Sequence, residues 1–276
     1  MPLTQLTIVG AGLIGGSLAL AARQKGAASR IVAIDRAHSH PRSQGIFDEW
    51  IQGDDHKKAE KWLASSDLTI LCVPVGTIID LLPDVLKATT GLVTDCGSTK
   101  QSIVHSVAAH PLRNRFIPGH PMAGRPLGGL ENAQGDLFCG QRWILCPQQN
   151  SIQDLVLLKN FIGQVGAEVL ELSAQDHDRS VAITSHVPQI IASLLAVLAE
   201  KNDALKAAGP GFASTTRVAG GAESMWHDIF ETNGQSIGST LIEVGEIMRT
   251  MGAQLNANQV DGALELLKQA RKLRSH

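Results

Sequence analysis

The chain has 276 residues, of which 43% are hydrophobic and 18% charged, and its net charge is −2. This length suits two domains, and the near-neutral charge gives no electrostatic basis for binding nucleic acid or an anionic membrane. Tyrosine is absent, which excludes any mechanism that uses a tyrosine phenol as acid or base.

The first 23 residues read as a short apolar strand, a glycine turn and a helix. Gly10 permits a tight turn, Gly12 lets a pyrophosphate approach the backbone, and Gly15 lets the helix pack closely on the strand. The N–H groups that open the helix would face the phosphates. This order predicts a dinucleotide site whose contacts in the turn are Gly10, Gly12, Leu13, Ile14 and Gly15.

A second apolar run, residues 31–34, ends in Asp35, twenty residues beyond Gly15. An acidic residue at that spacing can accept hydrogen bonds from the adenosine ribose hydroxyls. Arg36 follows directly and could meet a 2′-phosphate that Asp35 would repel. We expect both residues at the cofactor and favour NAD, with NADP possible.

The next elements continue an alternation of strands and helices. A polar stretch at 36–43 precedes a short helix expected over Gln44 to Trp50. Apolar runs at 68–73 and 91–95 predict central parallel strands, whose carboxyl ends meet at the ligand-binding edge of a doubly wound sheet. Residues expected at the cofactor on this edge are Val73, Pro74, Thr77 and Ser98. Ser98 is open to a second interpretation, because it could simply cap the helix that follows it.

His120 is the strongest candidate for a catalytic residue. It follows a short strand at 116–118, in an uncharged run between Gly119 and Gly124 at the same edge of the sheet. A histidine there should be neutral and able to accept a proton. The alternative is a histidine that only stabilises the loop.

The pattern changes near Leu172 and Ser173. Strands are predicted at 141–146 and 167–172 around a helix at 153–163, and everything after Ala174 reads as helix. We therefore expect an α/β fold with a dinucleotide-binding domain at 1–172, followed by an all-α domain at 173–276.

The all-α domain is expected to contain helices at 176–207, near Ala213 and Met225, at 235–251 and at 258–273. Pro188 cannot donate to the carbonyl of Thr184, so a kink or break is expected there. Long apolar faces on a small helical domain predict that it completes its core by forming a homodimer.

Two histidines and one arginine of this domain are candidates for the site. His177 and His186 lie nine positions apart, which places them on opposite sides of an ideal helix. Unless the helix is irregular, only one should face the site and the other belongs to an interface or the interior. We favour His186. Arg217, among small and apolar residues, suits bidentate binding of a carboxylate, although an inter-helix salt bridge is an alternative.

The cysteines and the N-terminus bear on the compartment. Cys72, Cys96, Cys139 and Cys146 lack C-x-x-C spacing, so we expect reduced core thiols and no metal site. The N-terminus lacks the features of a secretory signal, and the apolar stretch at 190–199 is too short to span a bilayer. We expect a cytoplasmic protein with no membrane partner.

Six motifs in order give the sequence a resemblance to the prephenate and arogenate dehydrogenase family, also called cyclohexadienyl dehydrogenases, which act in tyrosine biosynthesis. The motifs are Gly10 to Gly15, Asp95-Cys96-Gly97-Ser98-Thr99-Lys100, Gly119-His120-Pro121-Met122-Ala123-Gly124, Asp176-His177-Asp178-Arg179, Ser185-His186-Val187-Pro188, and Thr215-Thr216-Arg217 with Met225-Trp226.

The resemblance implies a Rossmann domain joined to a helical dimerisation domain, with the active site between them. It also implies NAD(P)-dependent oxidative decarboxylation of prephenate or arogenate to 4-hydroxyphenylpyruvate or L-tyrosine. By resemblance, His120 hydrogen-bonds the ring hydroxyl, Ser98 lies near that hydroxyl and the nicotinamide, and Arg217 holds a carboxylate. Further substrate contacts are expected at Gly124, Arg125, His186, Gln189 and Trp226.

Departures from the family pattern leave the substrate undecided. Pro126 stands where many members have an acidic residue, Gln189 where many have a second histidine, and Ala213-Ser214 where a charged pair is common. Gln189 can donate to a carboxylate or accept from an ammonium, which leans slightly toward arogenate. The two domains use the whole sequence, so no fused mutase or regulatory domain is expected.

Two other classes remain compatible with the sequence. One is a two-domain dehydrogenase of the β-hydroxyacid or imine-reductase type, which would use a catalytic lysine or a different helical site. The other is a non-catalytic dimer that senses NAD, which would not need Ser98, His120 and Arg217 together.

Overall fold

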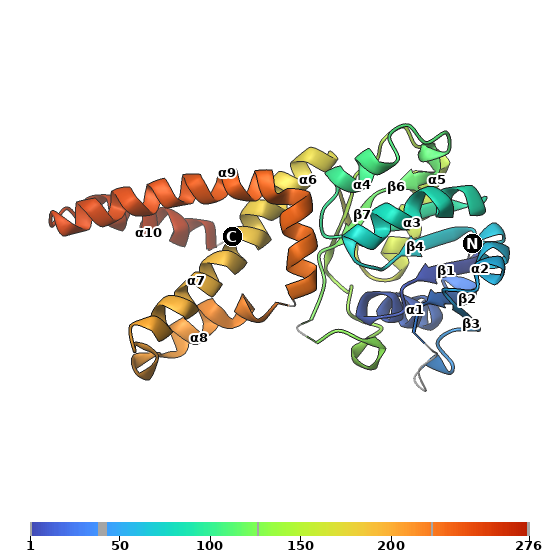
Figure 1. Cartoon of the computed structure of the whole chain (residues 1–276), viewed down its shortest axis with the longest axis horizontal. Helices are drawn as coiled ribbons and strands as arrows, with labels where there is room; N and C mark the ends of the chain where they lie inside the picture. The colour runs from blue at the N-terminus through green and yellow to red at the C-terminus, as the bar shows by residue number, and fades with distance from the viewer. Residues whose placement is uncertain (1, 38–42, 126, 222, 275–276) are drawn as a thin grey trace.

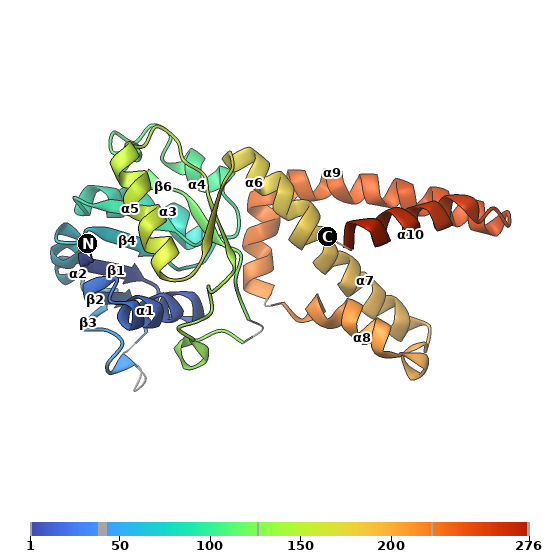
Figure 2. The same cartoon turned by 180° about the vertical axis from the view of Figure 1, so that it is seen from behind.

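The computed structural model describes residues 2–37, 43–125, 127–221 and 223–274 (Figure 1). Strands and helices alternate through residue 171, and helices follow from residue 174. Opposite views show the distal helices extending away from the α/β part, with the first of them lying against it (Figures 1 and 2).

A parallel sheet of six strands in the described ranges forms the centre of the α/β part, in the order β3-β2-β1-β4-β5-β6. This order reverses direction between β1 and β4, as expected for a doubly wound sheet, and ligands bind at the carboxyl ends of such strands. The strands are β1 (Leu3–Val9), β2 (Ala28–Asp35), β3 (Glu49–Gln52), β4 (Leu68–Leu71), β5 (Leu92–Asp95) and β6 (Phe116–Ile117).

Helices cover both faces of this sheet, which is why its central strands are apolar throughout. On one face, Leu6 and Ile8 pack with residues of α1 (Leu13–Lys25) and α5 (Ile152–Gln164). On the other, Val9 and Leu71 pack with residues of α2 (His56–Ala64), α3 (Val75–Ala88) and α4 (Gln101–Ser106). The expected α/β fold is confirmed.

A second, three-stranded sheet contains the candidate catalytic histidine. Strand β7 (Gly119–Pro121) runs antiparallel to β8 (Arg142–Leu145), which runs parallel to β9 (Glu168–Glu171). His120 is therefore on a strand, opposite Ile144, and not in a loop after one as the sequence suggested. The strand pairing fixes the backbone that carries its ring.

The helix expected over Gln44 to Trp50 is wrong. Glu49–Gln52 is strand β3, paired in parallel with Val32 to Asp35. The preceding turn is held by Asp48, whose carboxylate accepts hydrogen bonds from the N–H of Ile31 and from Arg23, each at 2.7 Å. These contacts outweigh the weak local preference of a seven-residue segment. Residues 38–42 of the polar stretch lie outside the described residues.

The helical part begins with a nearly continuous helical run. Its first 28 residues comprise α6 (Ala174–Val181), a π-helical turn (Ala182–His186) and α7 (Val187–Lys201). The interruption expected at Pro188 is confirmed, and it takes the form of this π turn, since Pro188 lies in the first turn of α7, where no N–H is needed.

The remaining helices are α8 (Pro210–Thr216), α9 (Glu223–Asn256) and α10 (Asp261–Arg274). The separate helices expected near Met225 and over 235–251 are one element, α9, bent at Asn233, where the backbone leaves helical geometry (φ −131°, ψ 16°). The Asn233 side chain donates to the carbonyl of Asp178 at 2.8 Å, which ties the bend to α6.

Much of the apolar surface of the helical part is uncovered. The run Ala174–Lys201 is long and apolar enough, by length and composition alone, to cross a membrane, and 28% of its apolar window is buried. This differs from the expectation drawn from 190–199 alone. Exposed large apolar residues include Leu194, Val197, Leu198, Ile242, Met248, Leu264 and Leu267.

All four cysteines are free. The sulfur atoms of Cys72 and Cys96 lie 3.7 Å apart at the ends of β4 and β5, and Cys146 is buried. Free thiols were expected, but Cys139 is exposed, so the assignment of every thiol to the core is wrong for that residue.

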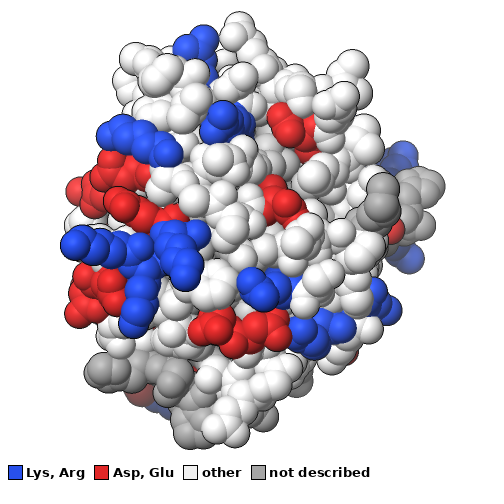
Figure 3. Space-filling view, turned by 90° about the vertical axis from the view of Figure 1, so that its right-hand side faces the viewer, with Lys and Arg blue, Asp and Glu red and all other residues white. Residues whose placement is uncertain are grey.

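The face of the α/β part that points away from the helices carries charges of both signs, interspersed over its described surface (Figure 3). Exposed and half-exposed ion pairs in this part of the chain include Arg23–Asp48 at 2.7 Å and Lys87–Asp84 at 2.9 Å. Such mixing produces no strong field of one sign over that face.

Candidate active site

The glycine turn between β1 and α1 has the geometry of a pyrophosphate cradle. Gly10 has φ +94°, and a Cβ there would lie 2.6 Å from both the Cys72 carbonyl oxygen and Val73 Cγ1. A Cβ on Gly15 would collide with the Gly10 carbonyl oxygen. At Gly12, in contrast, no described atom lies within 4 Å of the Cβ position. The backbone is open where a pyrophosphate would approach, and α1 begins there.

Asp35 reaches this turn from the end of β2. Its carboxylate accepts hydrogen bonds from the N–H groups of Ala11 at 2.6 Å and Ala37 at 2.8 Å. Arg36 is exposed beside it. Since an acid in this position suits ribose hydroxyls, the residues present fit the adenosine half of a nicotinamide dinucleotide. The turn also places Leu13 in the core and leaves Ile14 half-buried.

The ends of β4 and β5 complete this edge of the sheet. Val73 lies against Gly10, Pro74 is the N-cap of α3, and Thr77 is in the first turn of α3. Ser98 is half-buried in the turn after β5. The N-cap of α4 is Lys100, so the capping alternative for Ser98 is wrong. The residues expected at the cofactor thus lie at or after the carboxyl ends of neighbouring strands.

Helix α4 is capped from the helical part of the chain. Both oxygens of Asp178, on α6, accept main-chain hydrogen bonds, from Lys100 N–H at 2.7 Å and Gln101 N–H at 2.9 Å. Asp178 is fully buried. A residue 78 positions away from Lys100 therefore supplies the acceptors that a helix N-terminus requires.

Three hydrogen-bonded side chains, His120, His177 and Asp178, connect the α/β part to the helical part, and we call them the relay. His120 Nδ1 lies 2.8 Å from His177 Nε2, and His177 Nδ1 lies 2.8 Å from Asp178 Oδ1. His177 and Asp178 are both 0% exposed. The sequence predicted that only one of His177 and His186 would face the site unless their helix was irregular, and the helix is irregular, with a π turn at Ala182–His186.

The π turn explains why both histidines belong to one cluster. A π-helix closes i→i+5 hydrogen bonds and therefore turns less per residue than an α-helix, which alters the angle between positions 177 and 186. His186 is 2% exposed and packs edge-on to Trp226, with ring centroids 5.8 Å apart. Asn233 Nδ2 lies 3.3 Å from His186 Nδ1.

The histidines of this cluster favour the neutral form. Burial lowers the pKa of His120 well below its usual value, and the nearby His177, Lys100 and His186 lower it further. Burial also lowers the pKa of His177, although hydrogen bonding to Asp178 opposes the shift. The pKa of His186 falls to about 4, chiefly through burial. His120 therefore suits the role of proton acceptor near pH 7.

A buried ion pair holds the strand that carries His120. The ammonium of Lys100 donates to Asp95 and, at 2.7 Å, to the carbonyl of Gly119. Asp95 also accepts from the N–H of Gly119 at 3.0 Å. Both side chains of the pair are fully buried. The residue before His120 is thus held through both of its main-chain polar groups.

From the sequence, His177 ranks behind His186, and no role is predicted for Asp178, Lys100, Asp95 or Asn233. Four of them stand in motifs that were recognised, and the adjacent histidine and carboxylate at 177–178 were the only local signal of a relay. Their partners lie 57 to 78 positions away, so the pairing could not be read from local spacing.

The other residues expected to contact the substrate do not all lie together. Gly221 packs against the Trp226 indole, and a Cβ there would lie 3.3 Å from Gln189 Nε2. The buried indole N–H of Trp226 has no hydrogen-bond partner among the described residues. Of these residues, Trp226 packs on His186. In contrast, Gly124 and Arg125 are exposed after β7, and Pro126 lies outside the described residues.

Arg217 is exposed where α8 ends. The 3-10 turn that it opens, Arg217–Gly220, packs against α7, which carries Gln189. No ion pair involves Arg217 within the described ranges, so the inter-helix salt bridge considered for it is not formed in a single chain.

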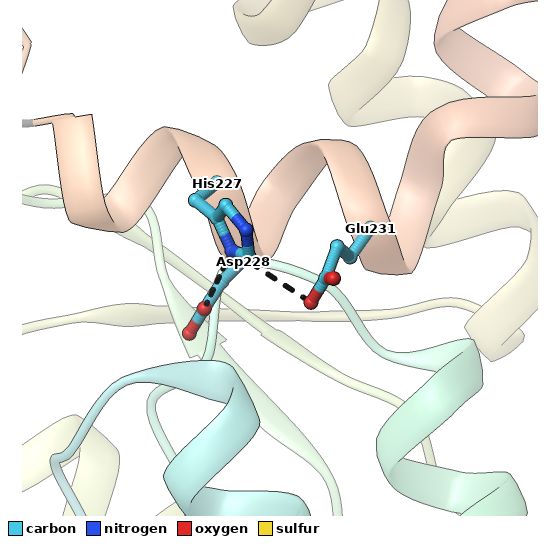
Figure 4. Close-up of side chains that lie close together, drawn as sticks. All are labelled: His227, Asp228 and Glu231. Carbon is cyan, nitrogen blue, oxygen red and sulfur yellow. Dashed lines mark ion pairs between the residues drawn. The ribbon is translucent and has the colours of Figure 1, made fainter.

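One cluster of metal-ligand type lies beside this site, at the start of α9 (Figure 4). His227 Nδ1 lies 3.9 Å from Asp228 and 3.7 Å from Glu231, at ion-pair range. His227 and Glu231 are exposed, and Asp228 already accepts a hydrogen bond from Gly76 N–H. This arrangement is that of a solvated helix face with one inter-domain contact.

A hollow of about 1200 Å³ lies at the opposite edge of the sheet. It is lined by α5 and by residues at or just before the amino ends of the strands, such as Leu3, Asp67 and Gly91. Because ligands of doubly wound sheets bind at the carboxyl ends, this hollow is not the candidate site.

A glycine cradle, an acid for the ribose and a neutral histidine at the carboxyl edge define a nicotinamide-dependent dehydrogenase, with a helical part that completes its site. Two family models match the chain: prephenate dehydrogenase, nucleotide-binding domain, over residues 18–171, and prephenate dehydrogenase, dimerization domain, over residues 173–269. The chain belongs to the prephenate dehydrogenase family, as the six sequence motifs indicated.

Individual relatives are similar along most of the chain. A prephenate dehydrogenase of Bacillus subtilis is 31% identical over 245 residues, which are 84% of this chain and 65% of that protein. The crystal structure of prephenate dehydrogenase from A. aeolicus, in complex with hydroxyphenyl propionate and NAD+, is 27% identical with a TM-score of 0.86, covering 100% of this chain and 98% of that one. Synechocystis arogenate dehydrogenase is 25% identical with a TM-score of 0.81, covering 98% and 99%.

Proposed function

We propose that this protein catalyses the NAD(P)-dependent oxidative decarboxylation of prephenate or arogenate in tyrosine biosynthesis. The observation that carries the proposal is the neutral His120, held on β7 beside the carboxyl edge where the glycine cradle and Asp35 fit a dinucleotide. Family membership and relatives of both substrate types support it.

The proposed reaction divides its work between the cofactor and the chain. A bound nicotinamide dinucleotide would supply the acceptor for the hydride from the ring carbon that bears the hydroxyl. His120 would accept the proton of that hydroxyl as the hydride leaves, and it would return this proton to the phenolate oxygen once the ring carboxylate has left as carbon dioxide and the ring has become aromatic. Ser98, in the turn after β5, is proposed to hydrogen-bond the hydroxyl and so orient it toward the base.

The helical part is proposed to hold the substrate's charged groups. Arg217 would bind a carboxylate, and Gln189, Trp226 and His186 would meet the side-chain end of the substrate. The Trp226 indole N–H needs an acceptor, and a substrate carboxylate would supply one. Gln189 can serve either a carboxylate or an ammonium, and its neutrality leans toward arogenate.

NAD is the proposed preferred cofactor. Asp35 is proposed to accept from the adenosine ribose hydroxyls, so its negative charge would repel a 2′-phosphate there. The exposed Arg36 beside it keeps use of NADP possible.

The proposed assembly is a homodimer through the helices after residue 173. The matching family model describes a dimerization domain, and the uncovered apolar residues of α7, α9 and α10 would supply the buried surface. A second copy, and not a membrane, is therefore the occupant we propose for the face around Leu194 and Leu198. We place this dimer in the cytoplasm.

The test measures reduced nicotinamide by absorbance with prephenate or arogenate and NAD or NADP, in all four combinations. Reduction with one substrate would support the proposal and name both substrate and cofactor. Binding of NAD with no reduction in any combination would refute it and favour a cofactor-sensing dimer. Reduction only with small β-hydroxyacids would favour the other dehydrogenase class.

A further inference from the structure

The three-residue chain from His120 to Asp178 crosses from the α/β part into the helical part. His120 is on β7, whereas His177 and Asp178 are on α6. The two hydrogen bonds are each 2.8 Å, so both distances are within the normal range for strong hydrogen bonds. The direction of these bonds decides which nitrogen of His120 is free to act.

Asp178 sets the direction of both hydrogen bonds. The oxygens of Asp178 act as acceptors toward the N–H groups of Lys100 and Gln101. His177 Nδ1 must then be the donor to Asp178 Oδ1, which places the proton of a neutral His177 on Nδ1. Its Nε2 is left without a proton and can only accept.

His120 must therefore donate from Nδ1 to His177 Nε2. A neutral imidazole carries a single N–H, so His120 Nε2 keeps a free lone pair. We propose that His177 and Asp178 are positioning residues that fix His120 as the Nδ1–H tautomer, which makes Nε2 the atom that receives the substrate's proton. This inference rests on the proposed function, and it identifies the reactive atom of that site.

The charged and titratable groups around the relay favour this assignment. Lys100, whose ammonium is fully buried against Asp95, would repel a second positive charge on His120. His186 approaches from the π turn and is also kept neutral by burial. A neutral His120 with a defined tautomer is the outcome of these contacts.

The relay also makes the protonation of His120 depend on the contact between the α/β part and the helical part. Asp178 holds the N-terminus of α4 and orients His177 with the same carboxylate. If α6 moved away from α4, His120 would lose its acceptor, and its proton could move to Nε2, the nitrogen that carries the proton in most neutral, solvated histidine side chains. The contact between α6 and α4 therefore favours the Nδ1–H tautomer of His120.

The test compares two variants of similar size and flexibility, His177→Gln and His177→Met, in the full-length protein. The glutamine carbonyl oxygen can replace His177 Nε2 as the acceptor, whereas the methionine thioether is a weak acceptor. We expect His177→Met to lower kcat roughly 10- to 100-fold, since an unoriented histidine adopts the wrong tautomer part of the time. His177→Gln should restore most of the loss, and the NAD dissociation constant should be unchanged in both.

The direct readout is the protonation of His120 by two-bond ¹H–¹⁵N spectra of histidine-labelled protein. The His120 signals are assigned by their loss in His120→Asn. We expect the proton on Nδ1 in the wild type and in His177→Gln, and a shift toward Nε2 in His177→Met. A wild-type proton on Nε2, or equal kcat in the two variants, would overturn the inference.

This spectrum separates the inference from the proposed function. A wild type with the Nδ1 proton but no reduction of either nicotinamide would support the relay and refute the function. Turnover with the proton on Nε2 would support the function and refute the relay. The wild-type spectrum decides the matter even where His177→Met fails to fold.

Discussion

The carboxylate of Asp228 accepts a hydrogen bond from the backbone N–H of Gly76 at 2.9 Å, across 152 positions of sequence. Gly76 is in the first turn of α3, next to the proposed cofactor residues Pro74 and Thr77. Asp228 is on α9, in the helical part. The start of α3, at the cofactor edge, is thus held from the other part of the chain, as the start of α4 is by Asp178.

Asp228→Ala should therefore destabilise the docked arrangement. An N–H group left without an acceptor costs about 1–3 kcal/mol, and we expect that loss in the free energy of unfolding measured with denaturant. Asp228→Asn is the matched control, because its amide oxygen can still accept from Gly76. Equal stability of the two variants would show that this hydrogen bond does not contribute.

His120→Asn should remove the proton acceptor while keeping a side chain of similar polarity. We expect kcat to fall about 10²- to 10⁴-fold, the usual contribution of a general base. The dissociation constant for NAD, measured by titration without substrate, should stay the same because the cradle lies in the β1–α1 turn. Residual activity above a tenth of the wild type would exclude His120 as the base.

The α/β fold could be predicted from the sequence because the patterns that indicate it are local. The glycine turn, Asp35 and the apolar runs each report one strand or one turn, and the structure places all of them at one sheet edge. The strand at 49–52 was missed because it depends on pairing with β2 and on the distant contacts of Asp48.

The relay could not be predicted from the sequence, because it depends on contacts between residues far apart in the chain. Its geometry depends on a π turn at Ala182–His186 and on the packing of α6 against α4, and an ideal helix would have separated His177 from His186. The bend at Asn233 likewise follows from hydrogen bonds to residues 47 and 55 positions away.

Arg217→Ala should weaken substrate binding more than it slows chemistry. Arg217 is exposed in the single chain, so we expect the loss of a charge-assisted hydrogen bond, about 1.5–3 kcal/mol, or roughly a 10- to 150-fold rise in KM. Arg217→Lys keeps the charge but not the planar fork and should fall between. An unchanged KM in Arg217→Ala would refute the carboxylate role.

Asp35→Asn should shift cofactor preference toward NADP. The amide keeps an acceptor for Ala11 N–H but removes the negative charge that would repel a 2′-phosphate. We expect the ratio of kcat/KM for NADP to that for NAD to rise about 10-fold, as for roughly 1.4 kcal/mol of repulsion near a protein surface. Arg36→Ala should move the ratio the other way. A ratio that Asp35→Asn leaves unaltered would place the 2′-position elsewhere.

The pH dependence of turnover should reflect the lowered pKa of His120. The base works only when neutral, so kcat/KM should stay level as the pH falls from 8 to 6.5 and decline only below that value. The measurement is kcat/KM for the preferred substrate between pH 4.5 and 8. A decline centred above pH 6.5 would contradict a buried, neutral His120.

The free energy of unfolding should fall as the solution is acidified, because His186 is buried in its neutral form. Burial lowers its pKa to about 4 in the folded protein, whereas the pKa of an ordinary histidine is 6.5, so between these values the unfolded chain binds more protons. The free energy of unfolding therefore decreases as the pH is lowered from 6.5 toward 4, and the contribution is fully present above 6.5.

A variant isolates this effect. His186→Asn removes the titrating ring but keeps a polar side chain for the contact with Asn233. Denaturant unfolding at pH 7 and at pH 5 should show a smaller loss of stability on acidification for the variant than for the wild type, after both are compared at equal protein concentration because a dimer is expected. The same loss in both proteins would mean that His186 is already protonated in the folded state, or that it is solvated there.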